Sequence, residues 1–138
     1  MQLNWSEKNV YSFGIRSGLK EEFQWAKEVG MNLFKFDVLE PLKKVLPELA
    51  GRPVYLTIDI DVLDPAHAPG TGTLEAGGIS SKELLASLVE LANSEVNVVG
   101  ADIVEVAPVY DHSEQTPIVA GKIVREIFAR LSTTALIK

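Results

Sequence analysis

Apolar residues in this chain alternate between short runs of strand length and longer stretches of helical spacing. The short runs are rich in β-branched and aromatic side chains, as strands are. They lie at Val10–Arg16, Met31–Phe36, Val54–Ile60 and Val96–Val106. Between and after them, apolar residues recur every three or four positions, so strands and helices alternate along the chain. This order predicts an α/β fold with mainly parallel strands and helices on both faces, a three-layer α/β/α arrangement.

Polar, Gly and Pro residues mark where the helices begin and end. The first helix is expected after Ser17-Gly18, with Gly30 closing it, and the second from Pro41 to Gly51, with Pro47 bending or dividing it. Ser80 and Glu83 form a capping-box sequence in front of a helix over Ser81–Asn93. Thr116 and Pro117 are expected to cap and start the last helix.

The most informative stretch is VYLTIDIDVLDPAHAPGTGTLEAGG, from Val54 to Gly78. An apolar strand ends in Asp59, Asp61 and Asp64 and leads into a loop, Val62–Ile79, that is rich in Gly and Pro. Loops longer than about 12–15 residues without structure of their own are usually functional or disordered. Because this loop has little charge and many rigid turn residues, we expect it to form a shaped wall of a site.

Asp59 and Asp61 are candidate metal ligands. Side chains two apart on a strand project to the same face, so these carboxylates should lie together. Two neighbouring carboxylates repel each other unless a cation neutralises them, and carboxylate oxygens suit Mg²⁺ or Mn²⁺. The alternative is that these aspartates cap a turn and face water.

Glu105 stands near the end of the fourth strand, at the edge where open α/β sheets bind ligands. A carboxylate there could hold a guanidinium group in a bidentate pair, or form an ion pair with an arginine of a neighbouring element. Asp111, His112 and Glu114 are expected to form a polar surface loop, and neither His67 nor His112 is expected to be a metal ligand.

Length and composition limit the function classes. The 138 residues predict one α/β domain over positions 1–138. A net charge of −6 without a Lys/Arg cluster argues against nucleic-acid binding, and the absence of cysteine excludes disulfides and thiolate sites. No stretch approaches the ~20 apolar residues of a membrane helix and the start lacks a signal-peptide pattern, so no membrane association and a cytoplasmic location are expected.

The segment TIDIDVLDPAHAPGTGTLEAGG closely resembles the signature of the ureohydrolase superfamily, which includes arginases, agmatinases and formiminoglutamases. FGIRSG near the start and ADIVEVAPVYDHSEQT near the end agree with it. The versions with PGTGT and VAPVYD are most similar to agmatinases, which convert agmatine and water to putrescine and urea. The resemblance runs over nearly the whole chain and implies an arginase-like α/β/α fold.

Matched position by position, the resemblance implies roles for four residues. Asp59 and Asp61 match aspartates that bind a two-Mn²⁺ centre, whose bridging hydroxide attacks the guanidinium carbon. Glu105 matches the glutamate that orients the substrate guanidinium, and Thr73 matches a threonine of the GTGT loop beside the substrate.

The chain also departs from the family pattern. Relatives are roughly twice as long, and the motifs GGDH and DAHxD of their first half, which supply the remaining metal ligands, do not occur in this sequence. The chain is therefore expected to be only the C-terminal half of the family fold, with a strand missing between those that hold Tyr11 and Tyr55.

Two main hypotheses follow from this departure. In the first, the chain is an enzyme part, inactive alone, that supplies one portion of an agmatinase site and pairs with a missing N-terminal half. In the second, it is an inactive truncated module that self-associates as a homo-oligomer through its open strand edge. A weaker third reading takes the two aspartates as a phosphatase nucleophile pair, but Leu63 stands where that pattern favours Thr or Val.

Overall fold

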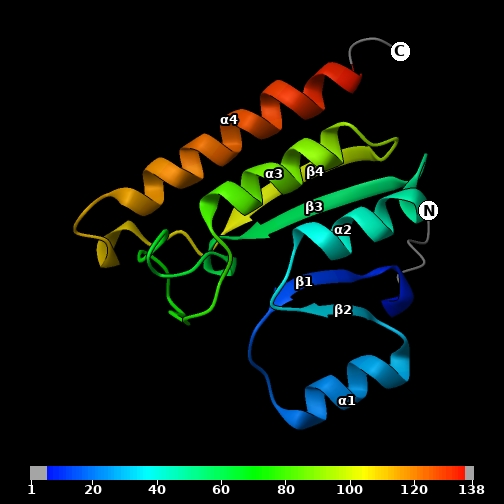
Figure 1. The fold of residues 1–138 in the computed structure, drawn as a ribbon, viewed down its shortest axis with the longest axis horizontal. Helices are drawn as coiled ribbons and strands as arrows, with labels where there is room; N and C mark the ends of the chain where they lie inside the picture. The colour runs from blue at the N-terminus through cyan, green and yellow to red at the C-terminus, as the bar shows by residue number, and fades with distance from the viewer. Residues whose placement is uncertain (1–5, 136–138) are drawn as a thin grey trace.

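The computed structural model describes residues 6–135, without the side chains of 130–135. Strands and helices alternate along most of the chain (Figure 1). The strands are β1 (Tyr11–Ile15), β2 (Asn32–Lys35), β3 (Pro53–Asp59) and β4 (Asn97–Val104). The α-helices are α1 (Lys20–Val29), α2 (Leu39–Val45), α3 (Ser81–Ala92) and α4 (Gln115–Ala135). Short 3₁₀ helices are η1 (Glu7–Asn9), η2 (Leu46–Leu49), η3 (Ile60–Val62) and η4 (Pro108–Tyr110).

The strands pair in parallel, as the strand–helix alternation predicts. β1 pairs with β2, and β3 pairs with β4 in a register that runs from Pro53 opposite Asn97 to Asp59 opposite Val104. Within the described part of the chain, β1 and β3 are not hydrogen-bonded to each other, so there are two small sheets rather than one. The interruption lies between the strands that hold Tyr11 and Tyr55, where the resemblance implies a missing strand.

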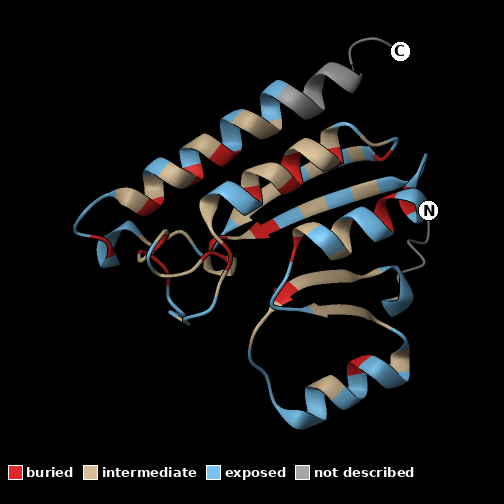
Figure 2. Cartoon of the chain, in the orientation of Figure 1, coloured by how far each residue is buried: buried red, intermediate tan, exposed pale blue. Residues whose placement is uncertain are grey.

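The helices cover the two sheets unequally. Figure 1 shows β1 and β2 between α1 and α2, an α/β/α stack. α3 contacts both α2 and α4, so these helices lie side by side over one face of β3 and β4. The opposite face of β3 is open to solvent: Tyr55 is 61% exposed, and exposed residues alternate with partly buried ones along the strand (Figure 2).

The hydrophobic core lies between the strands and the helices α2, α3 and α4. One buried cluster joins Ile58 and Ile60 of the β3 end to Leu84 and Leu88 of α3 and Ile123 of α4. A second cluster brings α2 and η2 against α3 and the starts of β3 and β4. None of the described helices is both long and apolar enough to cross a membrane.

The predicted boundaries at Gly30 and Ser80 are confirmed, whereas α2 begins at Leu39, two residues before the predicted start at Pro41. Gly30 ends α1 with a φ of 78°, and Ser80 and Glu83 form the reciprocal capping box of α3. Pro47 does divide the second helix, because α2 passes into η2 at this point. The prediction for Thr116 is wrong: α4 already begins at Gln115, so Thr116 lies inside the helix and is not its cap.

Candidate functional site

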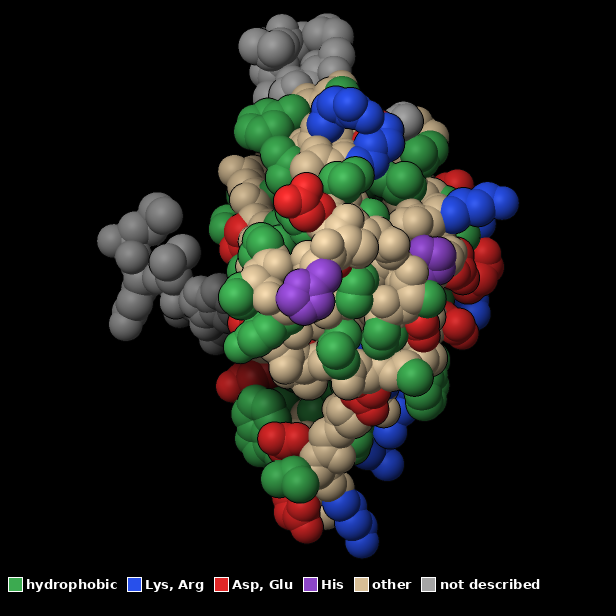
Figure 3. Space-filling view, turned by 90° about the vertical axis from the view of Figure 1, so that its left-hand side faces the viewer, with side chains coloured by type: hydrophobic (Ala, Val, Ile, Leu, Met, Phe, Trp, Pro, Cys, Tyr) green, Lys and Arg blue, Asp and Glu red, His purple; other side chains and the backbone are tan. Residues whose placement is uncertain are grey.

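The carboxyl ends of β1, β3 and β4 lead to the candidate residues. Arg16 follows β1, Asp59 ends β3, and Glu105 follows β4. β2 pairs with β1 on one side, and the chain then returns to place β3 on the other side of β1, so the direction of strand addition reverses at β1 (Figure 1). α1 and α2 accordingly lie on opposite faces of β1. Ligands of open α/β folds bind outside the carboxyl ends of strands at such a reversal. Figure 3 views the molecule from this side, where two histidines and scattered acidic side chains reach the surface.

Asp59 and Asp61 lie together, but not for the reason that the sequence suggests. β3 ends at Asp59 and the chain enters η3, so strand alternation does not reach Asp61. Instead, the Asp61 amide donates a 3.1 Å hydrogen bond to Oδ1 of Asp59, which caps η3. Asp59 therefore caps a turn, as the alternative predicts, and both carboxylates are only partly buried, so their oxygens remain accessible to a cation.

Several neighbouring charged groups act on the pKa of Asp61. Burial and the charge of Asp59 raise the pKa of Asp61, and the charge of Glu105 acts in the same direction. Arg16 lowers that pKa. Asp61 is thus within electrostatic reach of both Asp59 and Glu105, and a cation beside it would relieve the repulsion.

Asp59 and Asp61 have the donor chemistry that a divalent metal ion requires. Carboxylate oxygens suit Mn²⁺ or Mg²⁺. Within residues 6–135, however, no group of three or more His, Asp or Glu side chains converges in a way that could hold a metal ion. The described residues therefore do not fit a two-metal centre by themselves.

Glu105 stands just beyond β4 in a left-handed conformation with a φ of 63°, and it is exposed. Its Oε2 lies 3.6 Å from the position that a Cβ on Gly72 would occupy, so its carboxylate lies over the GTGT loop. Thr73 is the next residue of this loop and is also exposed. Among the described residues Glu105 forms no ion pair, so the alternative of an arginine partner is not supported.

The two ends of the long loop are hydrogen-bonded to each other at its base. Leu63 and Ile79 form a β-bridge, and the Asp64 amide donates to the Ile79 carbonyl at 3.0 Å. The Asp64 carboxylate accepts hydrogen bonds from the amides of Ala66 and Gly77, and these bonds lower its pKa. Asp64 is therefore a structural residue of the loop.

A second tie joins this loop to α4. The buried hydroxyl of Thr116 accepts a hydrogen bond from the Gly70 amide, and the Asp111 carboxylate accepts one from the Thr116 amide at 2.6 Å. Asp111 is buried, so the prediction that it belongs to a surface loop is wrong. His112 and Glu114 are exposed, as expected.

Arg16 is the contact residue that the sequence reasoning missed. Its guanidinium donates to the carbonyls of Asp61, Val62 and Glu75. The sequence signal that could have identified Arg16 is its place in FGIRSG, a stretch that agrees with the family pattern but implies no role for the arginine.

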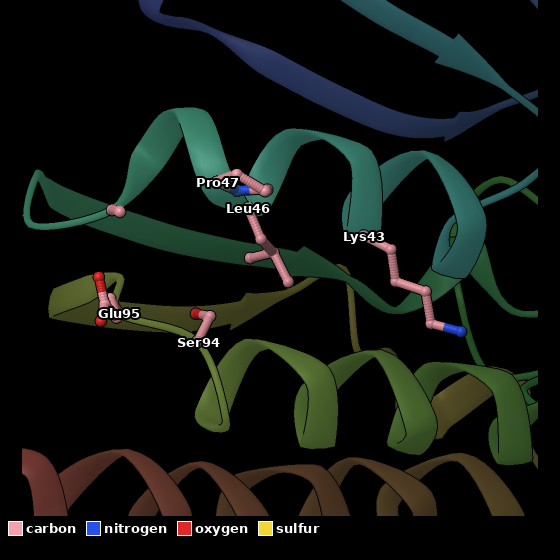
Figure 4. A pocket seen from close by; sticks show the side chains of 6 residues that line it. Lys43, Leu46, Pro47, Ser94 and Glu95 are labelled. Carbon is pink, nitrogen blue, oxygen red and sulfur yellow. The ribbon is translucent and has the colours of Figure 1, made fainter.

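The structure also has a pocket away from the carboxyl ends of the strands. Lys43, Leu46, Pro47, Ala50, Ser94 and Glu95 line it (Figure 4). Ala50 precedes β3 and Glu95 precedes β4, so this pocket lies at the amino ends of the strands. It is therefore at the opposite end of the sheet from Asp59.

Comparison with known proteins places these residues in a family context. The model of the arginase family matches residues 2–129. The chain is 82% identical over 120 residues to an agmatinase of Bacillus cereus and 79% identical over 119 residues to an agmatinase of Bacillus subtilis. These matches cover 87% and 86% of the chain but 41% of each relative.

Solved structures of amidino hydrolases and arginases also match most of this chain but less than half of their own length. Proclavaminate amidino hydrolase from Streptomyces clavuligerus is 36% identical with a TM-score of 0.78, and it covers 91% of this chain and 43% of its own. Arginase from Bacillus caldovelox is 27% identical with a TM-score of 0.77, over 89% of this chain and 44% of its own. The chain thus spans less than half the length of the proteins it matches.

Proposed function

Since the chain belongs to the arginase family, we propose that it acts as part of an agmatinase-like ureohydrolase, which hydrolyses agmatine to putrescine and urea. The family itself follows from the match over residues 2–129, and the agmatinase branch is supported by the identity of 82% to the agmatinase of Bacillus cereus. Beyond family membership, we propose that the substrate is agmatine, that the metal is Mn²⁺ and that this chain supplies only part of the active site.

The observation that carries this proposal is that Asp59, Asp61 and Glu105 stand at the same edge of the sheet, since Asp59 pairs with Val104 where β3 and β4 end. Agmatine carries a planar cationic guanidinium, and a free carboxylate binds such a group through two parallel hydrogen bonds. Glu105 is exposed and lacks an ion-pair partner in the described part of the chain, so it is available for this role. Thr73, in the loop beneath its carboxylate, lies beside the bound guanidinium.

Asp59 and Asp61 supply oxygen ligands to the Mn²⁺ that the family resemblance implies. Bound Mn²⁺ supplies an activated water as nucleophile. Because the described residues do not fit a two-metal centre alone, the remaining ligands come from a partner segment equivalent to the first half of the relatives. Without such a segment the chain is inactive.

The test is urea release from agmatine with excess Mn²⁺. The chain is assayed alone and with the N-terminal portion of the Bacillus cereus agmatinase, beside Asp61→Ala and the exposed-site control Asp37→Ala. We expect activity only in the mixture, with loss in Asp61→Ala and retention in Asp37→Ala. Activity of the chain alone would contradict the shared site, and an inactive mixture that nevertheless forms a complex would contradict the agmatinase function.

The open face of β3 and β4 favours a second candidate function. Tyr55 is 61% exposed, and Val104, on the same face, is 38% exposed. A sheet face of this kind, together with unpaired strand edges, promotes association. In this alternative the chain is a non-catalytic module that self-associates.

A further inference from the structure

Arg16 joins parts of the fold that are far apart in sequence. Nη2 donates to the carbonyls of Asp61 and Glu75, the latter at 3.2 Å, and Nη1 donates to the carbonyl of Val62 at 3.1 Å. These acceptors lie 45, 59 and 46 residues away in sequence. One side chain therefore ties the end of β1 both to η3 and to the far end of the long loop.

The chemistry of these contacts requires an arginine. All of its acceptors are backbone carbonyls, including that of the nearby Gly14 at 3.5 Å, and no carboxylate lies within ion-pair distance of Arg16 in the described part of the chain. A guanidinium presents several N–H groups in a rigid planar fork, whereas a lysine has one compact donor group on a flexible stem. Lysine would keep the positive charge but could not bridge η3 and the loop.

The position of Asp61 depends on these contacts. Its own carbonyl is one of the acceptors, so the orientation of the Asp61 peptide is fixed from β1. Thr73 stands two residues before Glu75, whose carbonyl is another acceptor. Around Gly14, Val62 packs closely enough that an added Cβ would meet it at 2.6 Å, which keeps β1 and η3 in contact.

We propose that Arg16 is a positioning residue that holds the Asp61 turn and the Thr73 loop in register at the candidate active-site edge. It acts through backbone carbonyls and does not touch the substrate. The role of Asp61 as a ligand rests on the function proposed above. The hydrogen bonds from Arg16 to the carbonyls of Asp61, Val62 and Glu75, called the clamp below, are a property of this chain.

The first experiment measures amide hydrogen exchange in the 138-residue chain. The reporters are the amides of Asp61, Asp64, Gly77 and Ile79, all hydrogen-bonded in η3 or at the loop base. Loss of charge-assisted hydrogen bonds in Arg16→Lys should speed their exchange by about tenfold or more. The Asn97 amide, at the other end of the sheet, should exchange at an unchanged rate.

Arg52→Lys is the matched control, because Arg52 donates to the Asn9 side chain at an exposed site away from the edge. It should leave the amides of Asp61, Asp64, Gly77 and Ile79 unchanged. Equal protection of the loop amides in Arg16→Lys and in the parent chain would overturn the proposal. A uniform increase that includes Asn97 would also overturn it, because that result describes a general loss of stability.

A measurement on the parent chain covers the case in which Arg16→Lys does not fold. Hydrogen bonds to fixed carbonyls slow rotation of the guanidinium, so NMR should show separate, slowly exchanging Nη protons for Arg16 and averaged ones for the exposed Arg52. An averaged Arg16 signal would overturn the clamp.

A final assay uses the mixture with the N-terminal portion of the relative. Arg16→Lys should lower kcat and weaken Mn²⁺ affinity with little change in KM, whereas Arg52→Lys should change none of these. If every mixture is inactive, the proposed function fails while the exchange result still decides the clamp.

Discussion

The Gly70 amide donates a 2.7 Å hydrogen bond to the hydroxyl of Thr116, which is completely buried at the start of α4. Together with the hydrogen bond from the Thr116 amide to Asp111, it joins the long loop to the last helix. The tip of the loop is thereby fixed independently of its base, where Leu63 meets Ile79.

Thr116→Val should destabilise the chain by about 1–3 kcal/mol, because the buried Gly70 amide would lose its acceptor without gaining water. Chemical denaturation measures this change. Thr57→Val is the control, since Thr57 is exposed on β3 and its replacement should alter stability by no more than about 0.5 kcal/mol. Equal stabilities of the two variants would contradict the buried bond.

Gly78→Ala should destabilise the loop base. A Cβ at this position would stand 2.4 Å from the Asp64 amide nitrogen and 2.5 Å from the Leu63 carbonyl carbon, so backbone must move at a cost of about 1–3 kcal/mol. Gly121→Ala in α4 is the contrasting variant, because nothing lies within 4 Å of its added Cβ. It should stabilise the chain by about 0.5–1 kcal/mol, and thermal unfolding compares the two.

Acid should weaken the chain partly through Asp111. Hydrogen bonds from Ser113 and Thr116 hold the pKa of Asp111 well below its usual value, so the folded state favours the ionised form. This stabilisation is complete above the unfolded pKa of about 4 and is lost as the pH falls further.

Asp111→Asn should therefore be less stable than the parent chain at pH 7, and the difference should narrow below about pH 4. Urea denaturation at several pH values measures it. Asp37→Asn, at an exposed position, should follow the parent chain throughout. A difference for Asp111→Asn that stays constant from pH 7 to acid would contradict the argument.

Glu105→Gln should impair substrate binding in the reconstituted enzyme. The amide keeps the size of the side chain but loses the charge and one acceptor, so KM for agmatine should rise by about 10–100-fold. Glu114→Gln is the control, because Glu114 is exposed beyond η4. An unchanged KM in Glu105→Gln would remove Glu105 from the substrate site.

Self-association, if it occurs, should use the open face of β3 and β4. Tyr55→Lys places a charge at the centre of this face and should shift the chain towards monomer in sedimentation experiments. Tyr110→Lys is a close match, because Tyr110 is 63% exposed but lies in η4. A monomeric parent chain would exclude the self-associating module.

Local signals predicted much of the fold. The capping box at Ser80, the left-handed glycine at Gly30 and the break at Pro47 depend on residues within a few positions of each other, and all three are confirmed. The parallel pairing followed from the alternation of strands and helices. Such features need no knowledge of distant contacts.

The features that were missed depend on such contacts. The carbonyls of Asp61, Val62 and Glu75 that Arg16 contacts lie 45 to 59 residues away, and the burial of Asp111 follows from its place between the long loop and α4. A polar, hydrogen-bonding sequence such as that around Asp111 is compatible with either surface or interior. The end of β3 at Asp59 could not be predicted either. Asp61 stands between the apolar residues Ile60 and Val62, so the sequence continues the alternation of a strand.

The pairing of β1 with β2 and of β3 with β4 has a consequence for how the chain acquires its structure. Each described strand pairs with a strand adjacent to it in chain order, across a single intervening helix in the first pair and across the long loop and α3 in the second. Tyr11 and Asn32 of the first pair are much closer in sequence than Pro53 and Asn97 of the second, so less chain entropy is lost when the first pair closes. During synthesis on the ribosome, the first pair can form before β4 has been translated.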